Sequence, residues 1–285
     1  MRRHLLLSVT SLATLLLTAT TGCAGNPMSQ EVIQRTVEDV IAANMAVETV
    51  SFELTTSTMV SIESAGQTSE QSSYGTGTGS VDNRNQRMHL LMTATTREEG
   101  ASESTTEVFV ADEWMYISAS VPGEEIQWMK MRMPEGLWEQ QDQVRQQVDL
   151  LKVADEVNYL GIEEVEGVKC YVVEIVPDMD SVRQMMAQVQ GPIPAVGGID
   201  PGAPELGEMV KQVSMTQYIA VDGYLFRRTD QRMLIEFTPA TLGIPDGEFD
   251  RVVEDTFTTL VFRNYNEPAT IQLPQGALAA TQIGA

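Results

Sequence analysis

Alternation of apolar and polar residues with a period of two is the feature that most constrains the fold of this chain. It is clear where Val50, Phe52 and Leu54 are separated by polar residues, and it recurs along most of the chain beyond that point. Because strand side chains point alternately to the two faces of a sheet, such segments suit a sheet with one covered face. The expected strands are 50–62, 74–80, 87–97, 103–111, 114–118, 126–133, 157–162, 168–176, 210–220, 224–237 and 252–262, with a polar turn over 64–73.

The order of these strands favours hairpins. Glu166-Gly167 and Asp222-Gly223 stand between neighbouring strands, and dipeptides of this type are strong hairpin signals. No segment shows the strand–helix–strand rhythm of a parallel sheet. The sequence therefore predicts an α+β fold with a single large antiparallel β-sheet of about ten strands.

Three segments have a helical period instead. We predict helices over 29–46, over 137–152, and from a cap at Asp178 or Asp180 onward. The last of these carries Val182, Met185, Met186 and Val189 at spacings i, i+3, i+4 and i+7.

The segment Tyr74–Ser80 places Gly75, Gly77 and Gly79 on one strand face. Its spacing does not match a GxGxxG nucleotide loop, and no helix start follows it. A strand face without side chains leaves room for the close approach of a helix or of a ligand. We favour a strand packed under a helix.

Residues 1–22 have the features of a secretory signal peptide. Arg2 and Arg3 precede an apolar run from Leu5 to Ala19, and small residues lead to Cys23. The run is shorter than the roughly 20 residues needed to span a bilayer. Small residues directly before a cysteine resemble the lipobox of bacterial lipoproteins, although Thr20 replaces the usual leucine. This resemblance implies that Cys23 is lipidated and becomes the first mature residue.

The predicted organisation follows from that anchor. Residues 23–28 form the lipidated cysteine and a short tether, which reaches no more than about 20 Å. Residues 29–275 form one domain, and 276–285 form a C-terminal tail. We therefore expect a protein exported across the cytoplasmic membrane and held at the cell envelope by N-terminal lipid.

The charge excludes one class of partner. Forty acidic residues outnumber eighteen basic ones, giving a formal net charge of −22. This charge argues against nucleic acid, whose phosphates would be repelled, and against a polybasic membrane-surface patch. The acidity is typical of a solvated exterior.

Residues for covalent chemistry are sparse. The chain beyond the signal has one histidine, His89. It lies between Met88 and Leu90 in a predicted strand, so its side chain points to the opposite face from theirs. Cys170 has the pattern of a buried strand residue. Asp178 with Asp180, and the group Asp246, Glu248 and Asp250, suit caps and turns better than a calcium loop. We expect no enzyme activity, no metal and no cofactor.

Three segments together resemble a known family. They are 148–172 with Glu166-Gly167, 218–227 around Asp222-Gly223, and 262–274. With the lipobox, they resemble the LppX/LprG-type lipoproteins of the LolA/LolB-like superfamily. The resemblance implies a curved half-barrel with about three helices on its concave side and an apolar cavity between them. It also implies binding or transfer of lipids or lipidated ligands, or, in a related branch, the sensing of envelope state through a protein partner.

The methionines are compatible with that expectation. Met is unbranched and polarizable, and it suits adaptable apolar surfaces. The residues expected to line an acyl-chain cavity are Met88, Leu90, Met92, Met129, Met131, Met133, Met185, Met186 and Val189. The Pro- and Gly-rich loop 191–207 would form its mouth with Ile193, Val196 and Ile199. Ordinary core filling is the alternative for each methionine.

Overall fold

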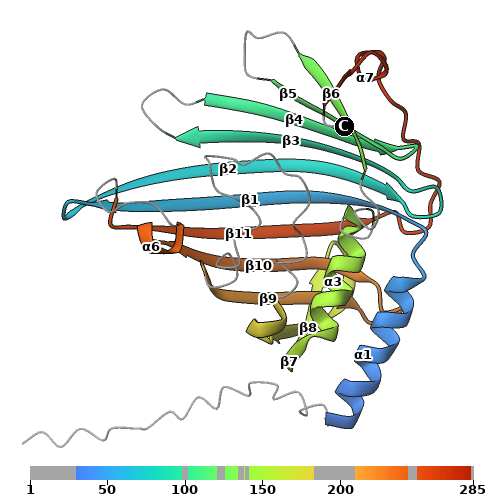
Figure 1. The fold of residues 1–285 in the computed structure, drawn as a ribbon. Coiled ribbons are helices and arrows are strands. Elements are labelled where there is room, and N and C mark those ends of the chain that lie inside the picture. Colours follow the sequence, from blue (N-terminus) through green and yellow to red (C-terminus); the bar gives the residue numbers. More distant parts are fainter. Residues whose placement is uncertain are drawn as a thin grey trace, which may run out of the picture.

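The structure is a computed structural model that describes residues 30–97, 102–120, 126–133, 138, 141–182, 209–242 and 249–283. Its helices are α1 (Gln30–Met45), α3 (Gln143–Lys152), α6 (Pro239–Leu242) and α7 (Gln275–Leu278). Its strands are β1 (Thr49–Ser64), β2 (Gln67–Asp82), β3 (Arg87–Arg97), β4 (Ser102–Ala111), β5 (Trp114–Ser120), β6 (Gln127–Arg132), β7 (Ala154–Val165), β8 (Val168–Pro177), β9 (Val210–Ala220), β10 (Phe226–Phe237), β11 (Arg251–Arg263) and β12 (Thr281–Gln282) (Figure 1).

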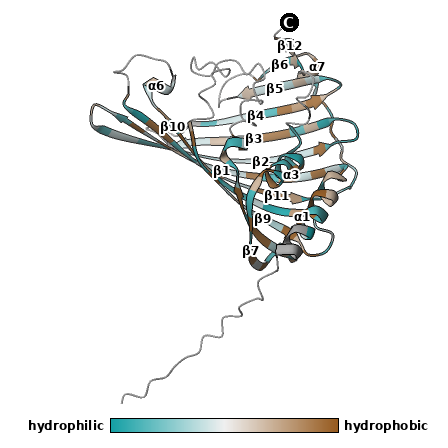
Figure 2. Cartoon of the chain, turned by 60° about the horizontal axis from the view of Figure 1, so that its bottom comes forward, coloured by the Kyte–Doolittle hydropathy of each residue, from teal (hydrophilic) through white to brown (hydrophobic). Residues whose placement is uncertain are grey.

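All twelve strands belong to one sheet with the order β12-β6-β5-β4-β3-β2-β1-β11-β10-β9-β8-β7. Neighbouring strands are antiparallel except β12, which pairs parallel with β6. The sheet bends around α1 and α3, which lie on its concave side (Figures 1 and 2). The predicted fold class, α+β with one large curved antiparallel sheet in a half-barrel, is confirmed.

Two-residue turns join several hairpins. Ala65 and Gly66 have φ values of 50° and 73°, and Glu166 and Gly167 have values of 50° and 81°. Positive φ at both central residues is typical of the type I′ turn, whose twist matches that of the strands. The predicted ten-residue turn over 64–73 is therefore wrong. Residues 67–73 form the first part of β2, and this part of the strand is mostly exposed, which explains its polar composition.

The main core lies between the concave face and the two helices. Val40 of α1 and Val148 of α3 are fully buried against a cluster that includes Phe52, Phe226 and Phe262. Burying a side chain of this size contributes roughly 1.5–3 kcal/mol. The apolar residues of the strands gather at the helix-covered ends (Figure 2).

The helices agree with their predicted periods but not with every boundary. Helix α1 covers almost the whole predicted range. Within the predicted range 137–152, residues 138 and 141 are helical, and α3 itself begins at Gln143. The Asp142 carboxylate caps α3 by accepting from the backbone N–H groups of Val144 and Arg145. The Asp178 carboxylate accepts from the backbone N–H of Ser181 at 3.0 Å, so Asp178 caps the helical residues 179–182.

A second, smaller core lies on the convex face of β4–β6. Phe109 and Tyr116 pack there against Ile271, Ala277 and Ala280. Residues 276–283, expected from the sequence to be a tail, thus provide most of α7 and all of β12. The ring of Trp128 lies against Gly276, where an added Cβ would stand 2.8 Å from two ring atoms.

Candidate functional site

The strand register arranges the concave face in rows that cross the sheet. The inner row contains Phe262, Phe52, Gly79, Leu90 and Val108. The middle row contains Gln217, Thr229, Leu260, Leu54, Gly77, Met92 and Thr106. The outer row contains Met215, Gln231, Thr258, Thr56, Gly75, Ala94 and Ser104.

These rows run from the core toward a half-buried surface. Phe262 and Phe52 of the inner row are buried, whereas Gln231, Thr258 and Thr56 of the outer row are half-buried. None of the residues in the three rows is ionisable. Beyond them stands Glu254, whose carboxylate accepts a hydrogen bond from the Thr256 hydroxyl at 3.1 Å.

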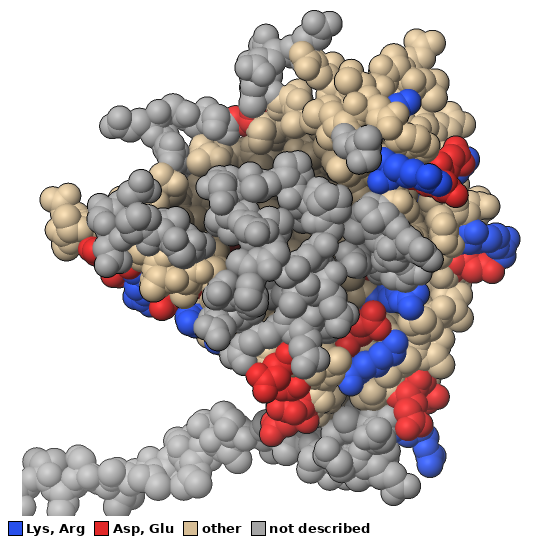
Figure 3. All heavy atoms as spheres, viewed as in Figure 1, with Lys and Arg blue, Asp and Glu red and all other residues tan. Residues whose placement is uncertain are grey.

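The convex face of the same strands is charged. Arg263 pairs with Glu53 and Glu166, and Arg232 forms two bonds to Asp255 at 2.6 and 2.8 Å. The Arg232 guanidinium lowers the pKa of the Asp255 carboxyl through these hydrogen bonds. In Figure 3, uncharged residues form the visible strand surface inside the bend, and charged side chains lie at its margin and over the helices. The sheet thus separates three uncharged rows on its concave side from ion pairs on its convex side.

Neighbouring side chains cover the glycines of β2. The Phe52 ring lies over Gly79, Met92 Cγ stands 3.0 Å from the place of a Cβ at Gly77, and Thr56 Cγ2 stands 2.8 Å from that at Gly75. The nearest described atoms at all three glycines thus belong to the neighbouring strands β1 and β3, and not to the helix that we favoured from the sequence.

The structure brings the described members of the methionine set onto one face. Met88, Leu90 and Met92 of β3 face the concave side, and the register places Met129 and Met131 of β6 on the same side through β4 and β5. Met88 is buried in the core, Leu90 and Met133 pack against it, Met92 and Met131 are half-buried, and Met129 is 39% exposed. Cys23, Met185, Met186, Val189, Ile193, Val196 and Ile199 lie outside the described residues. The role of the set as a cavity lining stays a prediction.

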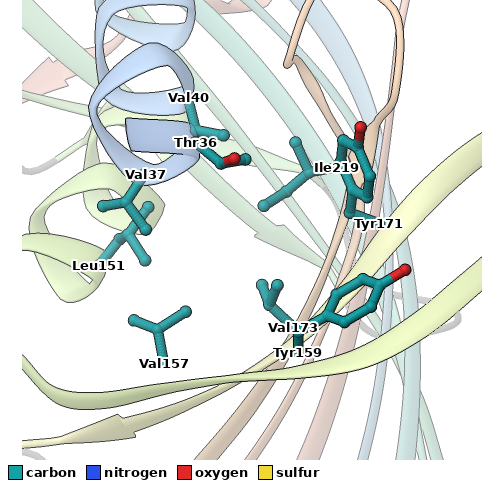
Figure 4. Close-up of a pocket in the computed structure, with 9 residues that line it drawn as sticks. All are labelled: Thr36, Val37, Val40, Leu151, Val157, Tyr159, Tyr171, Val173 and Ile219. Atoms are coloured by element: carbon teal, nitrogen blue, oxygen red, sulfur yellow. The ribbon is translucent and has the colours of Figure 1, made fainter. Parts of the chain in front are cut away.

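A small apolar pocket lies between the helices and the strands β7–β9 (Figure 4). It is lined by Thr36, Val37, Val40, Leu151, Val157, Tyr159, Tyr171, Val173 and Ile219, and its volume is about 20 Å³. That volume is close to the space of one water molecule. This pocket is too small for an acyl chain, and none of the methionines predicted as cavity lining contributes to it.

The residues singled out for chemistry have structural surroundings. His89 lies on the convex face, where its Nε2 is 2.8 Å from Glu107 and its ring stacks on Phe109 at 4.2 Å. Cys170 is fully buried, and burial raises the pKa of its thiol. Within the described ranges, no three His, Cys, Asp or Glu side chains stand close enough to hold a metal ion.

The fold and this face define an open half-barrel with a neutral inner surface. The chain belongs to a family of unknown function, DUF6612, which matches residues 30–282. No curated protein matches the sequence. Among the described residues, no helix has the length and apolar character needed to cross a membrane.

Several solved structures are similar at low identity. LprF from Mycobacterium bovis is 14% identical with a TM-score of 0.47, covering 88% of this chain and 99% of its own. The lipoprotein LppX from Mycobacterium tuberculosis is 15% identical with a TM-score of 0.43, covering 86% and 100%. The LolA superfamily protein NE2245 from Nitrosomonas europaea is 8% identical with a TM-score of 0.22, covering 84% and 94%. Because these scores are low, the likeness carries no statement about function.

Proposed function

We propose that this protein is an envelope lipoprotein of the LppX/LprG type that binds or transfers an acyl chain on the concave face of its sheet. Binding requires no covalent step. Binding of an acyl chain is favourable because apolar surface leaves water, and neutral side chains cost less to desolvate than charged ones would.

One observation carries this proposal, namely the segregation of charge across the sheet. On the concave side, the inner row is apolar, and the middle and outer rows contain small or neutral side chains. On the opposite side, the same strands carry the ion pairs of Arg263 and Arg232. Charged side chains are common on surfaces that contact only water, so three successive rows without charge are typical of a face that contacts something apolar.

The sequence supports attachment at Cys23. A diacylated cysteine holds a protein at a bilayer where one acyl chain would not. The short tether then keeps α1 close to the membrane, so the concave face can exchange acyl chains with it.

A matched pair of lysine variants tests the binding face. Thr56 and Ser57 are adjacent in β1 and point to opposite faces. Thr56→Lys places an ammonium group in the outer row, and we expect a loss of about tenfold or more in affinity for a fluorescent acyl probe. Ser57→Lys, on the exposed convex side, should leave affinity unchanged. Equal affinities for the two variants and the unmodified protein would contradict the proposal.

The anchor is tested separately. Cys23→Ser should move the protein from the membrane fraction to the soluble fraction after export. Mass spectrometry of the N-terminal peptide should find the lipid mass in the unmodified protein and not in the variant. An unmodified cysteine at position 23 in membrane-bound protein would refute lipid anchoring.

A second candidate is an interaction lipoprotein that binds an envelope protein, and an exposed patch on the convex face favours it. Ser57 pairs with both Phe257 and Tyr74, which are 45% and 49% exposed. Met59, two residues further along β1, is 52% exposed. Apolar patches of this kind mark interaction sites.

Affinity purification separates the two candidates. Capture of a stoichiometric protein partner without lipid, lost on Phe257→Ser, would favour the interaction lipoprotein. Co-purifying lipid that is unaffected by Phe257→Ser would favour the acyl carrier.

A further inference from the structure

Three buried polar side chains meet beneath α3. Gln217 of β9 and Thr229 of β10 stand directly opposite each other in the middle row, and the buried Gln147 of α3 contacts Gln217 through its backbone carbonyl. Their exposed fractions are 0%, 1% and 2%. In each, one oxygen has no hydrogen-bond partner within the described part of the chain: Gln217 Oε1, Thr229 Oγ1 and Gln147 Oε1.

The orientation of the Gln217 amide is fixed by its surroundings. Its Nε2 donates to the backbone carbonyl of Gln147 at 3.2 Å and contacts Met215 Sδ at 3.4 Å. Turning the amide around would set two carbonyl oxygens against each other. Gln217 Oε1 therefore remains a free acceptor, and Thr229 Oγ1 beside it can both accept and donate.

Buried polar groups without partners are rare in folded proteins because each costs free energy. Two of them lie on directly paired residues and the third on the helix residue that Gln217 contacts, so a hydrogen-bonding group placed here would satisfy groups that the described residues leave unpaired. Apolar residues continue the same row, since Leu260 pairs with both Thr229 and Leu54. The polar end of the row thus adjoins the surface proposed above for an acyl chain.

We propose that Gln147, Gln217 and Thr229 bind the uncharged, hydroxyl-bearing head group of an acyl ligand. This inference rests on the proposed acyl-chain binding and names its ligand class. A hydroxyl group suits the site because it can donate to a glutamine oxygen and accept from Thr229.

The same geometry discriminates against charged ligands. Among the described residues, neither the three side chains nor the other members of the three rows carry a positive charge, so an ionised carboxylate or phosphate would find no counter-charge in these rows. Selection would therefore come from the cost of the wrong head group as well as from the bonds to the right one.

The test compares lauryl alcohol with laurate, which share the chain and differ in the head group. Displacement of a fluorescent acyl probe from the purified protein gives both affinities. We expect lauryl alcohol to bind about tenfold more tightly than laurate. Thr229→Val and Gln217→Leu should each remove most of that preference by weakening the binding of the alcohol. Thr76→Val, the same change at an exposed position on the convex face of β2, should leave the preference intact.

Thermal unfolding of the ligand-free protein shows whether each variant still folds. Thr229→Val keeps the side-chain shape and should not lower the unfolding temperature. If the unmodified protein binds neither probe, the acyl-binding function itself fails. If it binds both and the two variants keep the original preference, an internal water alone occupies the site, and the head-group assignment is overturned while the acyl-binding function stands.

Discussion

The aromatic ring of Phe52 occupies the space that a Cβ atom at Gly79 would need. Ring atoms Cε1 and Cε2 lie 2.6 and 2.7 Å from that position, on the directly paired residues of β1 and β2. The glycine therefore allows a large ring from the neighbouring strand to fold across the sheet into the core.

Gly79→Ala should be destabilising because the Phe52 ring, itself packed against Phe262, must move. Overpacking of a core costs about 1–3 kcal/mol. Urea unfolding measures the effect. Thr78→Ala changes the adjacent, exposed residue on the convex face, and its cost should stay under about 1 kcal/mol. Equal costs at the two positions would argue against the close contact.

Asn44 joins α1 to the β9–β10 hairpin. Its amide donates to Val40 O at 2.8 Å and Tyr224 O at 2.9 Å, and its oxygen accepts from the backbone N–H of Phe226 at 3.2 Å. Asn44→Ala leaves buried backbone groups unpaired, so we expect a loss of about 2–3 kcal/mol in unfolding free energy. Met45→Ala, next to it on the exposed side of the helix, should cost far less. A similar loss for both variants would show that the hairpin does not depend on Asn44.

Asp142 gives a prediction about pH. Burial raises the pKa of its carboxyl, and the capping hydrogen bonds from Arg145 and Val144 only partly oppose this. The folded state then binds more protons than the unfolded state, so this residue's contribution to stability falls as pH rises from about 4 through the folded pKa. Asn caps a helix about as well as Asp without ionising.

Asp142→Asn should therefore gain stability relative to the unmodified protein as pH rises from about 4 to 7. Thermal unfolding of both proteins across that range measures the difference. A difference that does not change with pH, or that shrinks toward neutral pH, would contradict the raised pKa.

The attachment of α7 can be tested with neighbouring residues. Ala277 is fully buried against the convex core, whereas Leu278 is 64% exposed. Ala277→Asp would bury a carboxylate and should detach α7, at a cost of at least about 2 kcal/mol. The fluorescence emission of Trp128 should then shift to longer wavelength because its ring becomes exposed to solvent. Leu278→Asp should leave the emission unchanged. A shift in the Leu278→Asp variant and none in Ala277→Asp would contradict the packing of α7 through Ala277.

The sequence by itself determined the elements that depend on neighbours along the chain. The period of two in Val50, Phe52 and Leu54, the helical period in α1 and α3, and the turn at Glu166-Gly167 are local patterns, and each appears where expected. Where several polar residues followed one another in 67–73, the pattern could not separate an exposed strand end from a loop.

The tertiary structure alone decided which elements meet. The pairing of β1 with β11 joins residues about 200 positions apart, such as Phe52 and Phe262, and it sets the rows that distinguish a neutral face from a charged one. The meeting of Gln147, Gln217 and Thr229 likewise needs a helix and two strands from separate parts of the chain. Local periodicity tells which side chains share a face, but register between distant strands depends on the packing of the whole sheet.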